Sequence, residues 1–295
     1  MKKLFIFTHH DLDGAVCYLL TKWAHPEYTI EYKSVAMNNF RKELTTWLLH
    51  NNFGDYEKIF ILDIDCLEDK DLIDRENVMV IDHHQTLLDL KAFKNAVVIS
   101  KEYSSAVKLA YKVFKKLYNI TLTEPQKKLI ALADDYDSYK LQLTESRILN
   151  TVFWETNKNF NSFIKNFENG FSGFDKHQLA IYNIFLNELK ELINKSSFFE
   201  ANIKISNKPC KVVSTFATNY INDVAEYILE KFSADIAIVV NLKTDHVSFR
   251  RGKTDVDLSK IASKLCDGDG HEYSSGGVIT KQFLEFTNLL KPIKI

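Results

Sequence analysis

Short apolar runs alternate with amphipathic stretches along the first third of the chain. The runs are four to seven residues long, as expected for strands of a parallel sheet, and the stretches between them space apolar residues at helical intervals. Strands are predicted at 4–7, 29–35, 59–62, 78–81 and 96–99, with helices at 14–24 and 40–49. This alternation is typical of an α/β fold with a doubly wound, mostly parallel sheet.

The remainder of the chain is first helical and then mixed. Ser104-Ser105 is expected to cap one helix, and Thr123, Pro125 and Gln126 form the signature of a second helix start. The stretch 145–196 is helical in pattern, with a break at 169–173. Strands are expected again at 201–205, 211–214, 236–242 and 246–250, with helices at 222–232 and 258–265. We therefore expect a first domain at 1–172, a helical connector at 173–198 and a smaller α/β domain at 199–295.

Length and composition narrow the class of protein. The chain has 295 residues, of which 45% are hydrophobic, enough for two domains with cores of their own. A net charge of −1 argues against a large basic patch for duplex nucleic acid. The four cysteines are isolated in sequence, which is typical of reduced thiols in a cytoplasmic protein. The apolar run that ends at Phe7 is too short for a signal peptide, and no run reaches the length of a membrane span.

Acidic and imidazole side chains gather where predicted strands end. Because the carboxyl ends of parallel strands meet at one edge of a sheet, groups at these ends lie where open α/β sheets bind ligands. A fourth, acidic cluster lies on a predicted helix. The clusters are His9-x-Asp11-x-Asp13, Asp63-x-Asp65, Asp82-His83-His84 and Asp134-Asp135-x-Asp137.

The composition of these clusters indicates a metal site. Alternate residues of an extended segment point the same way, so one strand end can offer several ligands to one point. Carboxylates and imidazoles together suit manganese, iron or zinc, and a carboxylate-rich set suits manganese or magnesium. Six candidate ligands exceed the needs of one tetrahedral ion and fit two ions about 3.5–4 Å apart. The alternative is that these are solvated loop acids and a core histidine. Four such clusters, three of them at strand ends, favour the metal site.

The same residues resemble the motifs of a known family. The segments 8–15, 62–65, 82–84 and 133–135 are similar, in order and spacing, to the four motifs of the DHH phosphoesterase superfamily. The segment 268–277 and Ser248-x-Arg250 resemble the glycine-rich element and the S-x-R signature of the DHH-associated C-terminal domain. The opening of the chain is closest in style to bacterial oligoribonucleases of the nano-RNase B type.

The resemblance implies a role for each matching residue. It implies two divalent ions, manganese first, with magnesium and cobalt as alternatives. Asp63 would bridge the two ions, Asp82 would orient the histidine pair, and His84 would face the scissile phosphate. The implied metal ligands are His9, Asp11, Asp13, Asp63, His83 and Asp134, and the implied substrate-binding groups are Arg250, Gly270 and His271.

The sequence departs from the family pattern at two points. In the fourth motif, Asp134 and Asp135 compete for one ligand position; Asp134 is preferred because it follows Ala133, and Asp137 shares its helical face if the helix continues. In the glycine-rich element, Asp269 stands in place of the first glycine. An acid there weakens phosphate binding if it points inward.

The resemblance implies an enzyme. The leading hypothesis is a 3′–5′ exonuclease that hydrolyses short single-stranded oligonucleotides to nucleoside monophosphates. Alternatives are a phosphatase or phosphodiesterase for a 3′,5′-bisphosphate or a cyclic dinucleotide, and a non-catalytic nucleotide-binding protein. The expected partner is therefore a short oligonucleotide or small nucleotide. No membrane and no obligate protein partner is implied, and a homo-oligomer is left open.

Overall fold

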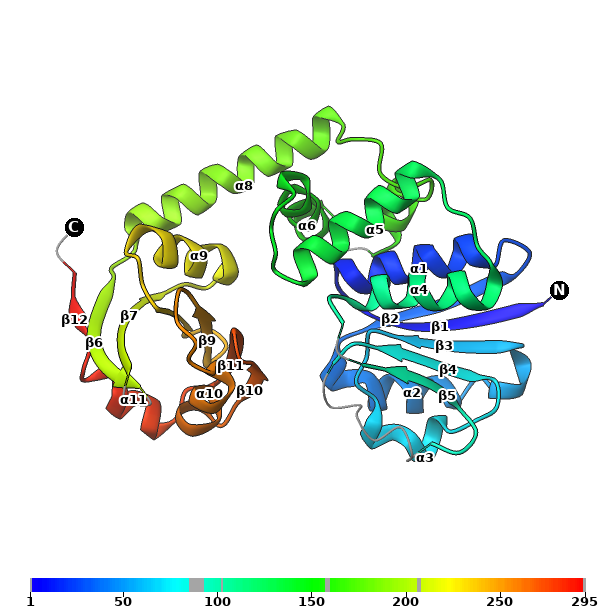
Figure 1. The fold of residues 1–295 in the computed structure, drawn as a ribbon, viewed down its shortest axis with the longest axis horizontal. Coiled ribbons are helices and arrows are strands. Elements are labelled where there is room, and N and C mark those ends of the chain that lie inside the picture. The colour runs from blue at the N-terminus through cyan, green and yellow to red at the C-terminus, as the bar shows by residue number, and fades with distance from the viewer. Residues whose placement is uncertain (1, 85–92, 102, 157–159, 206–207, 294–295) are drawn as a thin grey trace. The chain divides into compact units, whose positions relative to one another are not determined.

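The computed structural model of the chain describes residues 2–84, 93–101, 103–156, 160–205 and 208–293 (Figure 1). The chain divides into two compact units, residues 1–183 and 184–295. The boundary falls inside helix α8 (Lys176–Lys195), within the segment expected to be a connector. Each unit has its own sheet and its own buried apolar clusters.

The sheet of the first unit is entirely parallel. Its strand order is β2-β1-β3-β4-β5, so the chain leaves β1 toward one edge and returns to β1's other side at β3. This reversal is the topological switch point of a doubly wound sheet. All five predicted strands are confirmed, each within two residues at either end: β1 (Lys3–His9), β2 (Thr29–Val35), β3 (Lys58–Leu62), β4 (Val78–Asp82) and β5 (Val97–Ser100).

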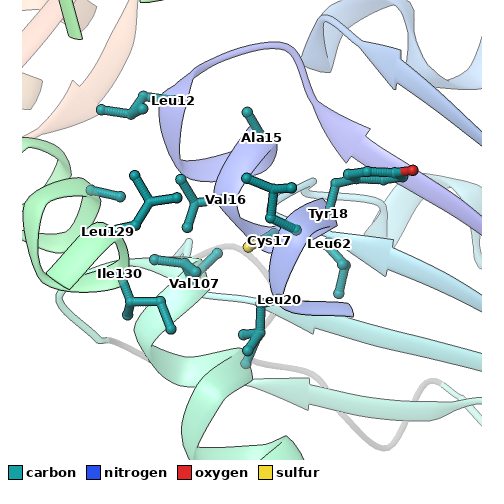
Figure 2. Packing of buried hydrophobic residues seen from close by; sticks show 14 of the residues in the cluster. Leu12, Ala15, Val16, Cys17, Tyr18, Leu20, Leu62, Val107, Leu129 and Ile130 are labelled. Carbon is teal, nitrogen blue, oxygen red and sulfur yellow. The ribbon is translucent and has the colours of Figure 1, made fainter. Parts of the chain in front are cut away.

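Helices cover both faces of this sheet (Figure 1). Leu4 and Ile6 belong to a buried cluster with α1, α4 and α5, whereas Phe5 and Phe7 belong to a cluster with α2, as the two-residue period of a strand requires. Figure 2 shows Val16 of α1 beside Leu129 of α5 in the first cluster. The helices of the unit are α1 (Leu12–Ala24), α2 (Phe40–Leu48), α3 (Lys70–Ile73), α4 (Ala106–Tyr118), α5 (Glu124–Asp137), α6 (Thr144–Thr156) and α7 (Phe160–Asn166).

The two predicted helix caps are present. Ser105 is the N-cap of α4, and its side chain accepts a hydrogen bond from the Lys108 amide. At the start of α5, the Gln126 amide donates to Thr123 Oγ1 over 3.4 Å, and the Thr123 amide donates to Gln126 Oε1 over 2.9 Å. This reciprocal pair satisfies amides that have no partner inside the helix.

The second unit is built on a mixed sheet of order β10-β11-β9-β8-β7-β6-β12, in which only β7 and β8 pair in parallel among the described strands. Strands β6–β9 and helices α9 and α10 confirm the predicted elements. The sequence does not predict four short elements, because their apolar residues show no clear period: β10, β11, β12 and α11. The bounds are β6 (Phe199–Ile205), β7 (Lys208–Phe216), α9 (Ile221–Lys231), β8 (Ile236–Asn241), β9 (His246–Arg251), α10 (Leu258–Cys266), β10 (Asp269–His271), β11 (Ser274–Val278), α11 (Lys281–Thr287) and β12 (Lys291–Pro292).

Two further sequence expectations concern the cysteines and the absence of a membrane span. All four cysteines are buried and unpaired, as expected of reduced thiols. Among the residues that the structure describes, no helix is both long enough and apolar enough to cross a bilayer.

The capping box provides a test of the fold. Thr123→Ala removes the hydroxyl that accepts the Gln126 amide, so the free energy of unfolding should fall by about 0.5–2 kcal/mol. Thr121→Ala is the matched control, because Thr121 is exposed in the preceding segment and its loss should change stability by less than about 0.5 kcal/mol. Urea unfolding of both variants measures the difference. Equal effects would show that the cap does not stabilise α5.

Candidate metal centre

Three predicted clusters meet at the switch point of the first sheet. His9 is the last residue of β1, Asp63 directly follows β3, and Asp82 is the last residue of β4. These three strands are neighbours in the sheet and run in the same direction. Their carboxyl ends therefore bring the clusters to one edge, as the sequence predicts.

The turn from β1 into α1 positions two aspartates. Asp11 is the N-cap of α1: its Oδ1 accepts the Gly14 amide over 2.9 Å, and its Oδ2 lies 2.7 Å from His9 Nδ1. Asp13 is buried and accepts the amides of Ala106 over 2.7 Å and Val107 over 3.1 Å, in the first turn of α4. A helix N-terminus stabilises a carboxylate through these free amides and its dipole.

Gly14 is required by the same turn. A Cβ at this position would lie 2.1 Å from the carbonyl oxygen of His9, far inside van der Waals contact. The helix therefore starts close against the end of β1 only with glycine here. This close approach explains why a glycine directly follows Asp13, the last aspartate of the motif.

Asp63 lies at the centre of the site. Its Oδ1 is 3.4 Å from His83 Nε2, and its Oδ2 is 3.7 Å from His9 Nδ1, so each carboxylate oxygen faces a different imidazole. The residue is buried and has a φ of 59°, in the left-handed region that costs a non-glycine residue about 1–2 kcal/mol. The turn after β3 thus holds this carboxylate between β1 and β4 at an energetic cost.

Each histidine of the third motif is oriented through its Nδ1. His83 Nδ1 donates to the carbonyl oxygen of Tyr103 over 3.3 Å, which leaves Nε2 directed toward Asp63. His84 Nδ1 lies 2.7 Å from Oδ1 of the fully buried Asp82, and the His84 amide donates to Oδ2 over 3.1 Å. Such bonds fix the tautomer and ring orientation of metal-site histidines. Asp82 therefore orients His84, whereas the expectation from sequence is that it orients both histidines; His83 is oriented by the Tyr103 carbonyl oxygen instead.

Asp134, the expected fourth-motif ligand, is engaged elsewhere. Its Oδ1 accepts hydrogen bonds from the hydroxyls of Ser104 and, over 3.0 Å, Ser105, and its Oδ2 accepts one from Lys108 Nζ over 2.6 Å. Lys140 Nζ lies 3.8 Å from the same oxygen. These contacts tie the end of α5 to the start of α4. The structure does not bring Asp134 into the groups that could hold an ion.

The other two acids of this motif have different surroundings. Asp135 is buried and accepts the Leu143 amide over 3.0 Å and the Ser146 hydroxyl over 2.7 Å, at the start of α6. Asp137, the last residue of α5, places Oδ2 3.6 Å from His83 Nε2. The three-residue step from Asp134 is the signal that could have identified Asp137, because it keeps both acids on one helical face.

The donors fall into three overlapping groups, and in each group one atom per residue lies within 4.8 Å of the others. Asp63 and His83 each belong to two groups. Asp137 Oδ2 is buried and has no hydrogen-bond partner among the described residues, as expected of a ligand atom that awaits a cation. The donor set contains only carboxylate oxygen and imidazole nitrogen, which suits divalent metal ions. The groups are His9, Asp11, Asp63; Asp63, His83, His84; and Asp13, His83, Asp137.

Burial and mutual repulsion set the charges of these groups. Burial raises the pKa of Asp137 to about 8, with the charge of Asp63 adding to the rise, and burial also raises the pKa of Asp13 well above its usual range. Burial alone would lower the pKa of His9 and His83, but hydrogen bonds to carboxylates raise each pKa to about 11. Burial likewise opposes ionisation of Asp63, but hydrogen bonds from His83 and His9 hold its pKa below the usual range. Added positive charge would therefore stabilise the carboxylates of this site.

The expected substrate-binding residues lie in the second unit. Arg250 on β9 and His271 on β10 both stand opposite Ser274 of the intervening β11. Arg250 Nη2 donates to Asn222 Oδ1 over 2.5 Å. Gly270 has a φ of 129°, and a Cβ there would lie 2.7 Å from the Ser274 carbonyl oxygen, so this position requires glycine. The side chains of Asp269 and His271 lie outside the described part of the structure.

Comparison with known families identifies a domain in the first unit. Residues 3–134 match the family model described as the DHH family, N-terminal domain. The N-terminal unit is a DHH-family domain. The match covers the first three motifs and ends at Asp134, before Asp137. No curated protein sequence matches the chain closely enough to count as a relative.

Solved structures with the same fold span both units of the chain. A pGpG-specific phosphodiesterase, PggH from Vibrio cholerae, has a TM-score of 0.58 and 16% identity, with 98% of this chain and 96% of that chain covered. An exopolyphosphatase-related protein from Bacteroides fragilis has a TM-score of 0.54 and 15% identity, with 98% and 90% covered. RecJ from Thermus thermophilus in complex with Mn²⁺ has a TM-score of 0.60 and 10% identity, with 97% and 51% covered. At these identities the likeness shows the fold.

The fourth motif offers a direct test of ligand identity. Asp137→Asn should lower the manganese bound per chain, because it removes an oxygen that faces His83 and has no other described hydrogen-bond partner. Asp134→Asn is the matched control and should leave manganese content near normal, since Asp134 is held by Ser105 and Lys108. Metal analysis of both purified variants decides between them. Loss of manganese in the Asp134 variant alone would show that Asp134, and not Asp137, is the ligand.

The same substitution predicts a pH dependence in the metal-free protein. The pKa of Asp137 is raised to about 8 in the fold, so its contribution to stability is full below its unfolded pKa and is lost as pH rises through 8. Asparagine carries no charge at any pH. In excess chelator, Asp137→Asn should therefore be more stable than the unmodified chain at pH 9, and the difference should shrink at pH 6. A difference independent of pH would contradict the assigned repulsion.

Proposed function

We propose that this DHH protein is a two-metal phosphodiesterase that hydrolyses short oligonucleotides, nanoRNA above all, from the 3′ end to nucleoside monophosphates. One observation carries the proposal: the two oxygens of Asp63 face different donor groups, one with His9 and one with His83. A carboxylate shared in this way suits two divalent ions about 3.5–4 Å apart, the arrangement used in in-line displacement at phosphorus. The DHH-family match supports phosphoester chemistry.

Six residues would hold the ions. We take manganese as the natural ion, with magnesium or cobalt as alternatives, because the donors are carboxylates and imidazoles. When bound, the ions would supply a water of near-neutral pKa and positive charge for the phosphate oxygens. Asp63 would lie between the two positions. The proposed ligands are His9, Asp11, Asp13, Asp63, His83 and, in place of Asp134, Asp137.

His84 would contact the scissile phosphate. Burial lowers its pKa, but the hydrogen bond to Asp82 and the charges of Asp82 and Asp63 together raise it, so a larger share of the imidazole is protonated at neutral pH. An imidazolium stabilises the negative charge that develops on non-bridging oxygens. Asp82 would act by orienting and charging this ring rather than by touching the substrate.

The second unit would hold the part of the substrate beyond the scissile bond. Arg250 offers a planar guanidinium, which binds phosphate oxygens in pairs. The neighbouring Gly270 and His271, on the same three-strand edge, would add backbone amides and an imidazole. Because these groups lie in a different unit from the metal ligands, they would determine substrate affinity rather than water activation.

A second candidate substrate class is supported by one comparison. The pGpG-specific phosphodiesterase PggH shares the fold over nearly the whole of both chains. A phosphodiesterase for a dinucleotide would use the same metal centre and a shorter substrate groove. A non-catalytic nucleotide-binding protein is disfavoured, because the donor set is complete. We place the activity in the cytoplasm, which the unpaired cysteines support.

A substrate panel tests the function. Protein stripped with chelator should lose phosphodiesterase activity and regain it best with manganese, because the ions supply the attacking water. The panel contains dinucleotides, RNA of increasing length, single-stranded DNA, a 3′,5′-bisphosphate and cyclic dinucleotides, with monophosphate release as the readout. Asp63→Ala is the inactive control. Full activity in excess chelator would refute the metal mechanism, and turnover of the bisphosphate alone would move the protein to the small-nucleotide class.

Substitution of Arg250 tests whether the second unit binds the substrate while the first unit holds the metal ions. Loss of a charged hydrogen-bond partner costs about 1.5–3 kcal/mol, so Arg250→Ala should lower kcat/KM on a dinucleotide by roughly ten- to over a hundredfold. Manganese content and the slow hydrolysis of bis(p-nitrophenyl) phosphate, which has no distal phosphate, should not change. Arg251→Ala is the matched control, because Arg251 pairs with Glu272 over 3.2 Å. Equal losses on both substrates would place Arg250 at the reacting phosphate.

A further inference from the structure

A separate cavity lies within the second unit, between the sheet and α10. Its volume is about 500 Å³, within the range of sites that bind small organic molecules. Most of its walls are aliphatic, contributed by β6, β7 and β8 on one side and by α10 on the other. Prominent apolar lining residues are Ile203, Val212, Ile238, Phe249, Ile261 and Leu265.

The cavity is on the other face of the sheet from Arg250. Phe249 pairs with Ile238, and both belong to the apolar cluster on the α10 side. Arg250 pairs with Ala237, which belongs to the cluster on the α9 side, and Arg250 bonds Asn222 at the start of α9. Because neighbouring residues of a strand point to opposite faces, the cavity does not share its lining with the proposed substrate-binding edge.

Four lysines and two aspartates line the cavity, so the lysines exceed the acids by two. Lys208 pairs with Asp255, and Lys260 Nζ lies 3.1 Å from Asp257 Oδ2. Lys264, one helical turn after Lys260, has no ion-pair or hydrogen-bond partner among the described residues and also lines the cavity. Both existing pairs are largely exposed, so they are weak and can rearrange around an incoming anion.

We propose that this cavity binds an amphipathic monoanion, a medium-chain carboxylate of the fatty-acid type. The alkyl chain would lie against Ile238, Phe249 and Ile261, and the carboxylate would bind Lys264 with support from Lys260. A purely apolar ligand would have no group to pair with the ammonium of Lys264. A polyanionic nucleotide would face the carboxylates of Asp255 and Asp257 and mostly aliphatic walls.

Binding can be measured with a fluorescent carboxylate. The probe is 11-(dansylamino)undecanoic acid, added to the full chain below its critical micelle concentration, and unlabelled hexanoate, octanoate and decanoate compete against it. Each added methylene should tighten competition by about fourfold, the value expected for burying one methylene. The neutral alcohol 1-decanol should compete more weakly than decanoate, because it has no charge for Lys264.

Two variants and one control locate the site. Lys264→Ala should weaken decanoate binding about fivefold and leave 1-decanol unchanged. Lys243→Ala, an exposed lysine in the β8–β9 turn, makes the same charge change away from the cavity and should have no effect. Ile261→Trp should block both ligands by filling the cavity, with circular dichroism to verify folding. Absence of saturable probe binding, or equal losses in the two lysine variants, would overturn the proposal.

Discussion

Repulsion among buried carboxylates is the constraint on which the rest of the first unit depends. Asp13, Asp63 and Asp137 are brought together at the edge of a parallel sheet, where burial and their mutual charges raise the pKa of Asp13 and Asp137. The two imidazoles on Asp63 offset part of this charge. These acids destabilise the fold by themselves, and bound divalent cations would relieve their repulsion. Structures keep such conflicts where a ligand resolves them. The surrounding apolar core supplies the stability that keeps these acids together in the fold.

The sheet and the helix termini together position the side chains of the site. Strand order places β1, β3 and β4 side by side, and their ends carry His9, Asp63 and His83 to one point. The start of α4 then holds Asp13 by two amides and Asp134 by its serines and Lys108. Thus Asp134 positions the helix that positions a proposed ligand, which accounts for a buried acid that lies beside the ion groups without joining them.

Much of the fold and the site follows from local sequence rules. The five parallel strands, the helix caps at Ser105 and Thr123, and the gathering of three polar clusters at strand ends all follow from period, capping chemistry and sheet topology. The role of Asp134 does not follow from these rules. Ser104 and Lys108, which bond to it, are distant from it in sequence, and no local pattern encodes that contact. The left-handed turn at Asp63 is likewise imposed by the neighbouring strands. The strands β10 and β11 are stabilised by sheet pairing rather than by a period of their own, so sequence patterns miss them.

Anomalous X-ray diffraction from crystals grown with manganese tests the central claim most directly. The account predicts two manganese peaks about 3.5–4 Å apart, with one oxygen of Asp63 on each, Asp137 on one of them, and Asp134 still bound to Ser105 and Lys108. A single peak, peaks that do not share Asp63, or an ion held by Asp134 in place of Asp137 would contradict the account.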